Sequence, residues 1–384
     1  MSGGNNRAIF DDRERAQAQA LLAQVPAPLL DWYDTHARVL PWRSNPSPYR
    51  VWISEIMLQQ TRVEAVRGYF ERFVAALPDI PSLAEVPDDQ LLKLWEGLGY
   101  YSRARNLKRA AQQVVERYGG GLPADPKALH ALPGIGEYSA GSIASIAFGL
   151  REPAVDGNVL RVLSRLLACR EEITRAQVRR ELTALAREML PQERVGDFNQ
   201  ALMELGALIC LPHGAPLCAG CPLAALCTGQ QEGIAASLPV RTKKKPQPVQ
   251  QMTVFLLTTG ERICLRRRPL TGLLAGLWEL PNTSGALSCS EAAAFLTELG
   301  LAPSALTAAG SGRHVFTHVV WEMSLYAAVL PADSPLPDGW QAVSGGELGR
   351  EIPLPGAFWR LLRNPEASAR FSAIFQPSGD SQPL

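Results

Sequence analysis

The sequence contains no apolar run long enough to cross a bilayer or to direct export, and its first residues, Met1 to Arg15, are polar and charged. We therefore expect no membrane association and a reducing, cytoplasmic location, where a disulfide framework is not favoured. An excess of charge is also lacking, because the formal net charge is only +1. Any nucleic-acid surface would have to come from local basic clusters, at Arg103 to Arg109, Arg241 to Lys245 or Arg266 to Arg268. Each of these clusters can also be read as a solvated face.

Internal repeats are absent as well, and the length predicts two or three domains of an ordinary globular protein. Up to about Cys227 the sequence favours helices, because apolar residues recur at spacings of three and four. The clearest helical stretches are Leu91 to Trp95, Ala104 to Tyr118 and Val178 to Met189. From Gly229 to Gln251 this pattern stops, and Gly, Ser, Pro and Gln around a lysine run are typical of an interdomain linker.

A second domain with strands is predicted after the linker. β-Branched and apolar residues favour short strands over Met252 to Thr258 and Arg262 to Leu265, on either side of a turn at Gly260. His314 to Leu330 contains two further strand-like runs, and Ser290 to Leu299 is predicted to be a helix. The residues from about Ser372 are rich in Pro, Ser, Gly and Gln, so we expect them to be disordered.

The most informative feature is a cysteine window, Cys210-x7-Cys218-x2-Cys221-x5-Cys227, which contains four of the seven cysteines. Four thiolates this close can surround one metal centre, and a reducing compartment leaves zinc or an iron–sulfur cluster as the main candidates. Structural zinc usually takes two Cys-x2-Cys knuckles, and this window has only one, with uneven gaps. Bacterial iron–sulfur clusters accept short uneven spacings, so a [4Fe-4S] cluster is favoured over zinc and over buried cysteines without a metal.

A tight turn between two helices is predicted at Leu132-Pro133-Gly134-Ile135-Gly136. Gly134 and Gly136 would let the backbone turn sharply and approach a ligand closely. In a helix-hairpin-helix, such a turn points backbone amides at a DNA phosphate. Taken alone, the turn is better explained as a plain helix connection.

An acidic residue follows some twenty residues later, in Val155-Asp156-Gly157-Asn158-Val159. Taken alone, Asp156 is explained equally well as a helix N-cap. The order of hairpin, acid and cysteine window, however, is that of the helix-hairpin-helix DNA glycosylases that carry an iron–sulfur cluster, and the chain resembles that superfamily.

Within the superfamily, the chain is most similar to the MutY-type adenine DNA glycosylases, over roughly residues 29 to 365. The matching stretches are Leu40-Pro41-Trp42-Arg43, Val51 to Thr61, Gly97 to Arg103, the hairpin turn, Val155 to Val159 and Phe198-Asn199-Gln200. These enzymes remove adenine mispaired with 8-oxoguanine. The resemblance therefore implies hydrolysis of an N-glycosidic bond in duplex DNA, after the target base has been flipped out of the stack.

The resemblance also implies catalytic roles. Adenine is a poor leaving group unless its ring is protonated, and Glu55 matches the family's general acid. Its apolar neighbours favour a pKa raised by burial over the alternative of a surface glutamate on an amphipathic helix. Asp156 matches the carboxylate that stabilises positive charge on the sugar, either electrostatically or by transient covalent attack, and Asn158 would orient the acid or the attacking water. By family match, the adenine pocket contains Trp42, Arg43, Leu58 and Gln200, and the DNA-contacting residues are Gln60, Tyr100, Leu132, Gly134 and Gly136. Trp42 and Leu58 are equally well explained as core residues.

Position 138 separates subclasses of these enzymes. In relatives similar to endonuclease III, a lysine at this position forms a Schiff base with the sugar and cleaves the strand. Here the residue is Tyr138, so the resemblance implies a monofunctional enzyme that leaves an abasic site. Tyr138 is either part of the catalytic site or a packed aromatic.

The second domain resembles the Nudix-related domain of these glycosylases, most clearly over Gly272 to Pro281. The helical glutamate cluster that Nudix hydrolases use to bind magnesium is missing, so we expect recognition without pyrophosphatase activity. Phe316-Thr317-His318 aligns with the family's Phe-Ser-His loop, which probes 8-oxoguanine. Threonine keeps the hydroxyl donor and acceptor and adds a methyl group.

The resemblance supports a [4Fe-4S] cluster held by Cys210, Cys218, Cys221 and Cys227. One departure is that seven residues, Leu211 to Leu217, separate the first two cysteines where the family usually has six. Pro212, Gly214 and Pro216 mark this stretch as an irregular loop, which can absorb one residue.

The predicted fold class is α+β and multidomain, with an all-α helix-hairpin-helix domain and its iron–sulfur loop, followed by an α/β Nudix-like domain. The predicted segments are an N-terminal extension (1–28), the glycosylase domain (29–209), the cluster loop (210–228), the linker (229–250), the 8-oxoguanine recognition domain (251–366) and a disordered tail (367–384). The expected partner is double-stranded DNA with adenine opposite 8-oxoguanine or guanine, bound by a monomer associated with a bacterial nucleoid. Two alternatives remain, a noncatalytic iron–sulfur DNA-binding protein and a bifunctional, endonuclease III-like glycosylase and lyase.

Overall fold

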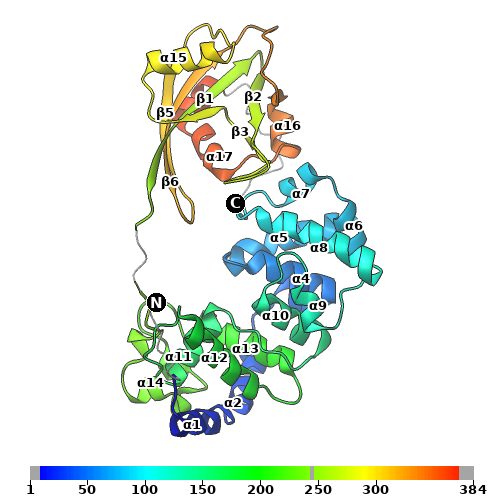
Figure 1. Ribbon diagram of the computed structural model, residues 1–384, viewed down its shortest axis with the longest axis vertical. Coiled ribbons are helices and arrows are strands. Elements are labelled where there is room, and N and C mark those ends of the chain that lie inside the picture. The colour runs from blue at the N-terminus through cyan, green and yellow to red at the C-terminus, as the bar shows by residue number, and fades with distance from the viewer. Residues whose placement is uncertain (1–8, 243–245, 372–384) are drawn as a thin grey trace, which may run out of the picture. The chain divides into compact units, whose positions relative to one another are not determined.

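The computed structural model describes residues 9–242 and 246–371 and divides into two units (Figure 1). Unit 1 consists of Met1–Glu85 and Asn106–Lys244, and unit 2 consists of Val86–Arg105 and Lys245–Leu384. Unit 1 is helical, and every named strand of the described residues belongs to unit 2. The predicted α+β, multidomain fold class is confirmed.

Unit 1 begins with α1 (Asp12–Leu22) and α2 (Pro26–His36), so the predicted N-terminal extension contains a helix. None of the helices in the described residues is both long enough and apolar enough to cross a membrane. The later helices of the unit are α3 (Pro41–Ser44), α4 (Pro48–Leu58), α5 (Val63–Ala76), α6 (Ile80–Glu85), most of α8 (Ser102–Tyr118), α9 (Pro126–His130), α10 (Glu137–Phe148), α11 (Gly157–Leu166), α12 (Ala176–Glu188) and α13 (Val195–Leu208). The helices predicted over Ala104 to Tyr118 and Val178 to Met189 are confirmed as α8 and α12.

One core of unit 1 is built by the apolar faces of α1, α2, α11, α12 and α13, whose buried members include Leu29, Leu163, Leu182 and Phe198. The cysteine window packs against this core through Cys210, Cys221 and Cys227. Its backbone forms the short 3-10 turns η1 (Cys218–Gly220) and η2 (Ala224–Leu226) and then α14 (Thr228–Gln231).

The predicted linker begins with ordered backbone. α14 runs through Gln231 because the amide of Gln231 donates to Cys227 O at 3.0 Å, and η3 (Ala235–Ser237) follows. Farther on, Val240 O accepts from the Ile173 amide at 3.0 Å. The stretch is therefore tied to unit 1 up to Val240, and β1 begins at Val249, before the predicted end of the linker.

Unit 2 contains a mixed sheet with the strand order β3-β2-β1-β6-β5, in which β4 also pairs with β1 and β7 with β2. Its strands are β1 (Val249–Thr259), β2 (Arg262–Arg267), β3 (Trp278–Glu279), β4 (Asn282–Ser284), β5 (Thr307–Val315), β6 (Val320–Val329) and β7 (Trp340–Ser344). β1 and β6 are parallel, and the other pairs are antiparallel. The predicted hairpin at Gly260 is confirmed, since Thr258 is paired with Ile263 across it.

Helices cover both faces of this sheet (Figure 1). On one face, α15 (Cys289–Glu298) packs Leu296 against Phe255 and Leu257 of β1, and this helix confirms the prediction over Ser290 to Leu299. On the other face, α17 (Gly356–Leu362) packs Phe358 against Leu256. Because β1 side chains alternate between two covered faces, every residue from Met252 to Thr258 is buried.

The segment Val86–Arg105 contributes α7 (Asp88–Leu94) to unit 2 and confirms the helix predicted near Leu91. Lys93 fixes this segment, because its Nζ donates to Leu348 O at 2.9 Å and to Ile352 O at 3.1 Å. These carbonyls belong to the region of α16 (Gly345–Arg350).

Two features of unit 2 differ from the sequence prediction. β5 begins at Thr307, well before His314. The sequence did not predict this earlier part of the strand because Ala308, Gly310 and Gly312 favour strands weakly. α18 (Pro365–Phe371) continues the chain as a helix, and the part of the predicted disordered tail after Phe371 lies outside the described residues.

Candidate functional site

A cleft of about 1370 Å³ opens in unit 1, between side chains of α4, α10, α11, α12 and α13. It is lined by these residues that the sequence singled out: Trp42, Arg43, Glu55, Leu58, Gln60, Gly136, Tyr138, Asp156, Asn158 and Gln200. The predicted catalytic residues and the predicted adenine-pocket residues therefore share one cavity.

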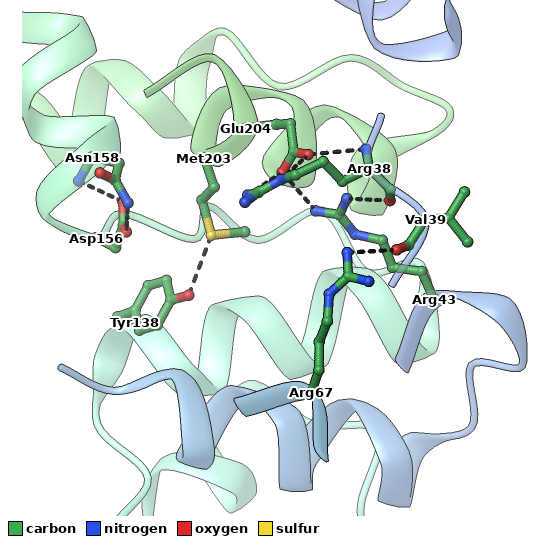
Figure 2. Close-up of polar contacts among 9 residues, drawn as sticks. All are labelled: Arg38, Val39, Arg43, Arg67, Tyr138, Asp156, Asn158, Met203 and Glu204. Atoms are coloured by element: carbon green, nitrogen blue, oxygen red, sulfur yellow. Dashed lines mark hydrogen bonds and ion pairs between the residues drawn. The ribbon is translucent and has the colours of Figure 1, made fainter. Parts of the chain in front are cut away.

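Glu55 lies on α4, which begins at Pro48 after a Ser47 N-cap. Its side chain is buried, at 6% exposure, and its Oε2 accepts a hydrogen bond from the Tyr138 hydroxyl at 2.7 Å. Burial raises the pKa of Glu55, although the hydrogen bond from Tyr138 acts to lower it. The alternative of a surface glutamate is therefore wrong. The Tyr138 hydroxyl also lies 3.2 Å from Met203 Sδ, a contact that Figure 2 marks with a dashed line.

Asp156 is the N-cap of α11, so that interpretation is confirmed. The residue also lines the cleft, where its catalytic role stays a prediction. Its Oδ1 accepts from the Val159 amide at 2.8 Å. It also accepts from the Asn158 amide at 2.8 Å, and its Oδ2 accepts from Asn158 Nδ2 at 2.7 Å (Figure 2). Burial raises the pKa of Asp156, and these donors act in the opposite direction. The result is a carboxylate whose orientation is fixed by its own helix.

Arg161, which the sequence did not indicate, fixes the side chain of Asn158 by a hydrogen bond. It is buried, and its Nη2 donates to Asn158 Oδ1 at 2.9 Å and to Gly206 O at 2.8 Å, while its Nε donates to Cys210 O at 2.8 Å. A Cβ on Gly206 would stand 2.6 Å from the Cβ of Asn158, so only glycine allows α13 to approach α11 this closely. The cysteine window is thus tied to the Asp156–Asn158 pair.

Asn199, in the matched Phe-Asn-Gln stretch, fixes the loop that leads to Asp156. Its Oδ1 accepts from the Ala154 amide at 3.1 Å, and its Nδ2 donates to Glu152 O and to Ser145 Oγ, both at 2.8 Å. Asn199 is buried at 1% exposure. This amide therefore joins α13, α10 and the loop before α11.

Glu204 forms a buried ion-pair network with Arg38 and Arg43 (Figure 2). Its Oε1 accepts from Arg38 Nε at 2.7 Å, and its Oε2 accepts from Arg38 Nη2 at 3.0 Å and Arg43 Nη2 at 3.1 Å. Burial acts to raise the pKa of Glu204, but the bonds and charges of the two arginines bring it below its ordinary value. Glu204 stands between the apolar Leu202 and Leu205 in the sequence, and an acid among core residues is a signal for such a pair. Arg38 gives no comparable signal.

The predicted pocket residues differ in exposure. Trp42 is buried and packs edge-on against Phe70, with ring centroids 5.4 Å apart, so it is a core residue as well as a cleft residue. Leu58 and Gln200 are half-buried, and Gln60 is exposed with a φ of 58°. The cleft therefore offers apolar walls with an amide and a guanidinium among them.

The helix-hairpin-helix turn lies between α9 and α10. Gly134 has a φ of 79°, and a Cβ there would stand 2.8 Å from Asn106 Cβ, so the turn requires glycine at this position. Gly136 has an ordinary φ of −84° and is the N-cap of α10, so the expectation that both glycines make the sharp turn holds for Gly134 alone. The Leu132 side chain is buried, which leaves its backbone as the part that a ligand can reach.

The four window cysteines lie close enough together for each of the other three to raise the pKa of Cys221, which burial and these neighbours bring to about 11. Arg165 Nη1 donates to Cys210 Sγ at 3.1 Å and to Leu211 O at 2.9 Å. Among the described residues, no group of three or more His, Cys, Asp or Glu side chains is spaced to hold a single metal ion. A four-iron cube spreads its thiolates over separate corners, and four soft thiols with a guanidinium beside one of them suit such an anionic cluster.

Unit 2 holds the other predicted contacts. Phe316, Thr317 and His318 lie in the turn between β5 and β6, where Gln247 Nε2 donates to Phe316 O at 2.7 Å and to Thr317 O at 2.6 Å. Phe316 packs against His314 and Trp321, whereas Thr317 and His318 are exposed. Tyr100 also belongs to unit 2, with 43% exposure and a φ of 48°.

The basic clusters of the sequence are only partly solvated. Arg103 is buried and donates to Leu98 O at 3.1 Å, and Arg266 and Arg268 both bind the buried carboxylate of Glu279. The interpretation as a solvated face is therefore wrong for these three arginines. In the cluster Arg241 to Lys245, residues 243–245 lie outside the described residues.

Comparison with known proteins gives two family matches. Residues 53–188 match the HhH-GPD superfamily of base excision DNA repair proteins, and residues 253–364 match the NUDIX domain. The chain is similar to an adenine DNA glycosylase of Rattus norvegicus, with 34% identity over 91% of this chain and 76% of that protein. It is 36% identical to an adenine DNA glycosylase of Homo sapiens, over 80% of this chain and 67% of that protein. A solved thermostable thymine-DNA glycosylase aligns with 58% of this chain and 100% of its own, at 28% identity and a TM-score of 0.49.

Proposed function

The chain belongs to the adenine DNA glycosylases, which are hydrolases of N-glycosyl bonds in base excision repair, and we propose that it is a monofunctional member acting on adenine opposite 8-oxoguanine or guanine. One observation supports this above the others. The buried acid Glu55 and the fixed pair Asp156 and Asn158 face the same cleft. The proposal includes a monomer that works on double-stranded DNA in a bacterial nucleoid.

The first step proposed is protonation of the flipped adenine. Glu55 gives its proton to a ring nitrogen, and the electron pair of the N-glycosidic bond then leaves with the base. Because Tyr138 donates to Oε2, the proton is carried on Oε1. The raised pKa of Glu55 keeps this proton in place at a higher pH than a solvated glutamate would.

The second step is capture of the sugar cation. The ionised Asp156 stabilises the positive charge at the anomeric carbon, and Asn158 keeps that carboxylate in place. A water molecule then adds to the anomeric carbon and gives its proton to Glu55, which restores the acid. Tyr138 has no amine, so no Schiff base forms at that position and the strand stays intact.

The adenine pocket is proposed to consist of Trp42, Arg43, Leu58 and Gln200. Arg43 is held by Glu204 on one side and by Arg38 O, which accepts from Arg43 Nη1 at 3.2 Å, on the other. A guanidinium fixed in this way can present a donor to the base without a further loss of side-chain entropy.

The opposite base is proposed to be read by unit 2. Phe316, Thr317 and His318 would probe 8-oxoguanine through the exposed Thr317 hydroxyl, and Gln60 and Tyr100 would enter the duplex as wedges. Pyrophosphatase activity is not part of the proposal. Of the two acids on α15, Glu291 is engaged in a capping box with Ser288, and no glutamate cluster accompanies it in the described residues.

We further propose that Cys210, Cys218, Cys221 and Cys227 hold a [4Fe-4S] cluster. The cluster would supply structural cross-linking of the loop, because hydrolysis transfers no electron. Purified protein should then contain about four irons and absorb in the visible region, and Cys221→Ser should lose both properties. Stoichiometric zinc in place of iron would contradict this part of the proposal.

The test of the reaction is single-turnover processing of a duplex with adenine opposite 8-oxoguanine, with and without alkali after the reaction. We expect strand breaks only after alkali, and none with Asp156→Asn. Breaks without alkali would instead indicate a lyase. DNA binding without base release from any adenine mispair would indicate a noncatalytic protein.

A further inference from the structure

We propose that the cleft-facing side of α12 binds the backbone phosphates of the DNA strand that carries the extruded nucleotide. This surface, called the α12 wall here, consists of Ala176, Arg179, Arg180, Thr183, Ala184 and Arg187. The proposal rests on the proposed function for the identity of the ligand as DNA. It assigns a binding role to residues that gave no signal in the sequence.

The α12 wall is a single helix face. Its members recur at spacings of three and four, and all of them line the cleft. On the other side of the helix, Val178, Leu182 and Leu185 are buried in the core of unit 1. Packing therefore fixes which side of α12 faces the cleft.

Charge on α12 is segregated between its two sides. The acids Glu181 and Glu188 do not line the cleft, and both are bound by Arg15 of α1, at 3.0 Å and 2.6 Å. The arginines of the helix point the other way. The cationic residues of α12 therefore line the cleft, and neither of these two acids does.

Two of the wall arginines are available for a ligand. Arg187 is already paired with Glu152 at 2.6 Å. Arg179 and Arg180 are exposed, and within the described residues neither side chain makes a hydrogen bond or an ion pair. Both guanidiniums can therefore donate to a ligand phosphate without first breaking an ion pair within the protein.

The chemistry of the wall favours phosphate over other anions. A guanidinium presents two parallel donors that match phosphate oxygens, and Thr183 adds a hydroxyl at the next turn. Ala176 and Ala184 are small, so a sugar-phosphate chain can come close to the helix. Asp156 lines the same cleft, so a nucleotide with its sugar at Asp156 would bring its flanking phosphates toward this wall.

The test is the salt dependence of binding to a fluorescently labelled duplex that carries a non-hydrolysable adenine nucleotide analogue opposite 8-oxoguanine, so that the nucleotide can be extruded without base release. The variant is Arg179→Gln with Arg180→Gln. Removing two phosphate contacts should make the plot of log K against log salt shallower by about 2. The matched control is Arg13→Gln with Arg117→Gln, which removes the same charge from exposed positions outside the cleft and should keep the wild-type slope.

The lysine pair, Arg179→Lys with Arg180→Lys, keeps the charge and should also keep the slope. Equal slopes for the glutamine pair and the control would overturn the inference, as would a lysine pair that behaves like the glutamine pair. If the wild type releases adenine but the glutamine pair keeps the wild-type slope, the phosphate-binding role of the α12 wall is wrong and the proposed function stands. If the glutamine pair has a shallower slope but the wild type releases no adenine, the α12 wall binds phosphate and the proposed function is wrong.

Discussion

The hydroxyl of Tyr100 lies 2.8 Å from Oγ1 of Thr317, and both residues belong to unit 2. Either hydroxyl can be the donor. The bond joins a residue expected to enter the duplex to the loop expected to probe the opposite base. It also helps to fix a tyrosine whose φ of 48° is unusual for a bulky residue.

If this bond sets the position of the Thr317 hydroxyl, Tyr100→Phe and Thr317→Val should each lower the preference for 8-oxoguanine over guanine opposite adenine. One hydrogen bond contributes about 1 kcal/mol, so each change should cost roughly fivefold in the ratio of kcat/KM values. The double variant should cost no more than Thr317→Val alone, because Tyr100→Phe acts only through the hydroxyl that Thr317→Val removes. Thr317→Ser, which keeps the hydroxyl, is the control, and strictly additive losses would contradict the coupling.

Tyr138→Phe should move the alkaline limb of the pH–rate profile to higher pH. On the proposed mechanism base release needs protonated Glu55, so the rate should fall as the pH rises through the raised pKa of that acid. The Tyr138 hydrogen bond lowers this pKa, so its removal raises the pKa further. Single-turnover rates across the pH range measure the shift. Tyr33→Phe, a change on the same cleft at a tyrosine that does not bond Glu55, should leave the limb in place.

Asp156 should separate catalysis from stability when it is replaced in two ways. Asp156→Asn keeps a good N-cap on α11 but loses the charge, so base release should fall by about a hundredfold or more with little change in thermal stability. Asp156→Ala loses both, and the free energy of unfolding should fall by about 1 kcal/mol in addition. Equal unfolding temperatures for the two variants would show that the cap contributes nothing.

Glu204→Gln should destabilise the protein at neutral pH and remove part of its acid sensitivity. The pKa of Glu204 in the folded state lies below its ordinary value of 4.5, so the network stabilises the fold above that pH. This contribution is lost as the pH falls through the folded-state pKa, where wild type and variant should converge. Because both arginines are partly exposed, we expect about 2 kcal/mol from denaturant unfolding at pH 7. Glu181→Gln, which breaks a more exposed pair with Arg15, should cost under about 1 kcal/mol.

Local pattern explains which parts of the fold were predictable. Apolar spacing was enough for α8, α12 and α15, and a glycine between two apolar runs was enough for the β1–β2 hairpin. The N-cap role of Asp156 was also predictable from local sequence, because an acid directly before a helix can cap it whatever the tertiary structure. By contrast, β5 begins earlier in the chain than predicted because its first residues pair with β6, and local sequence does not reveal this tertiary contact.

The supporting residues of the site were not predictable for the same reason. Arg38 and Glu204 are 166 positions apart, and Lys93 bonds to carbonyls more than 250 positions later. No periodicity links residues at such separations. Arg161 is closer to Asn158, but an arginine within a helix is read as solvated unless its burial is known.

The three hydrogen bonds donated to Asp156 have a consequence for substrate selection. A carboxylate gripped by its own helix end and by Asn158 cannot swing to follow a misplaced sugar. On the proposed mechanism, the nucleotide therefore has to rotate until its anomeric carbon reaches the fixed carboxylate. A partly extruded nucleotide could then reach Glu55 while its sugar remained too far from Asp156. Its N-glycosidic bond would not be cleaved.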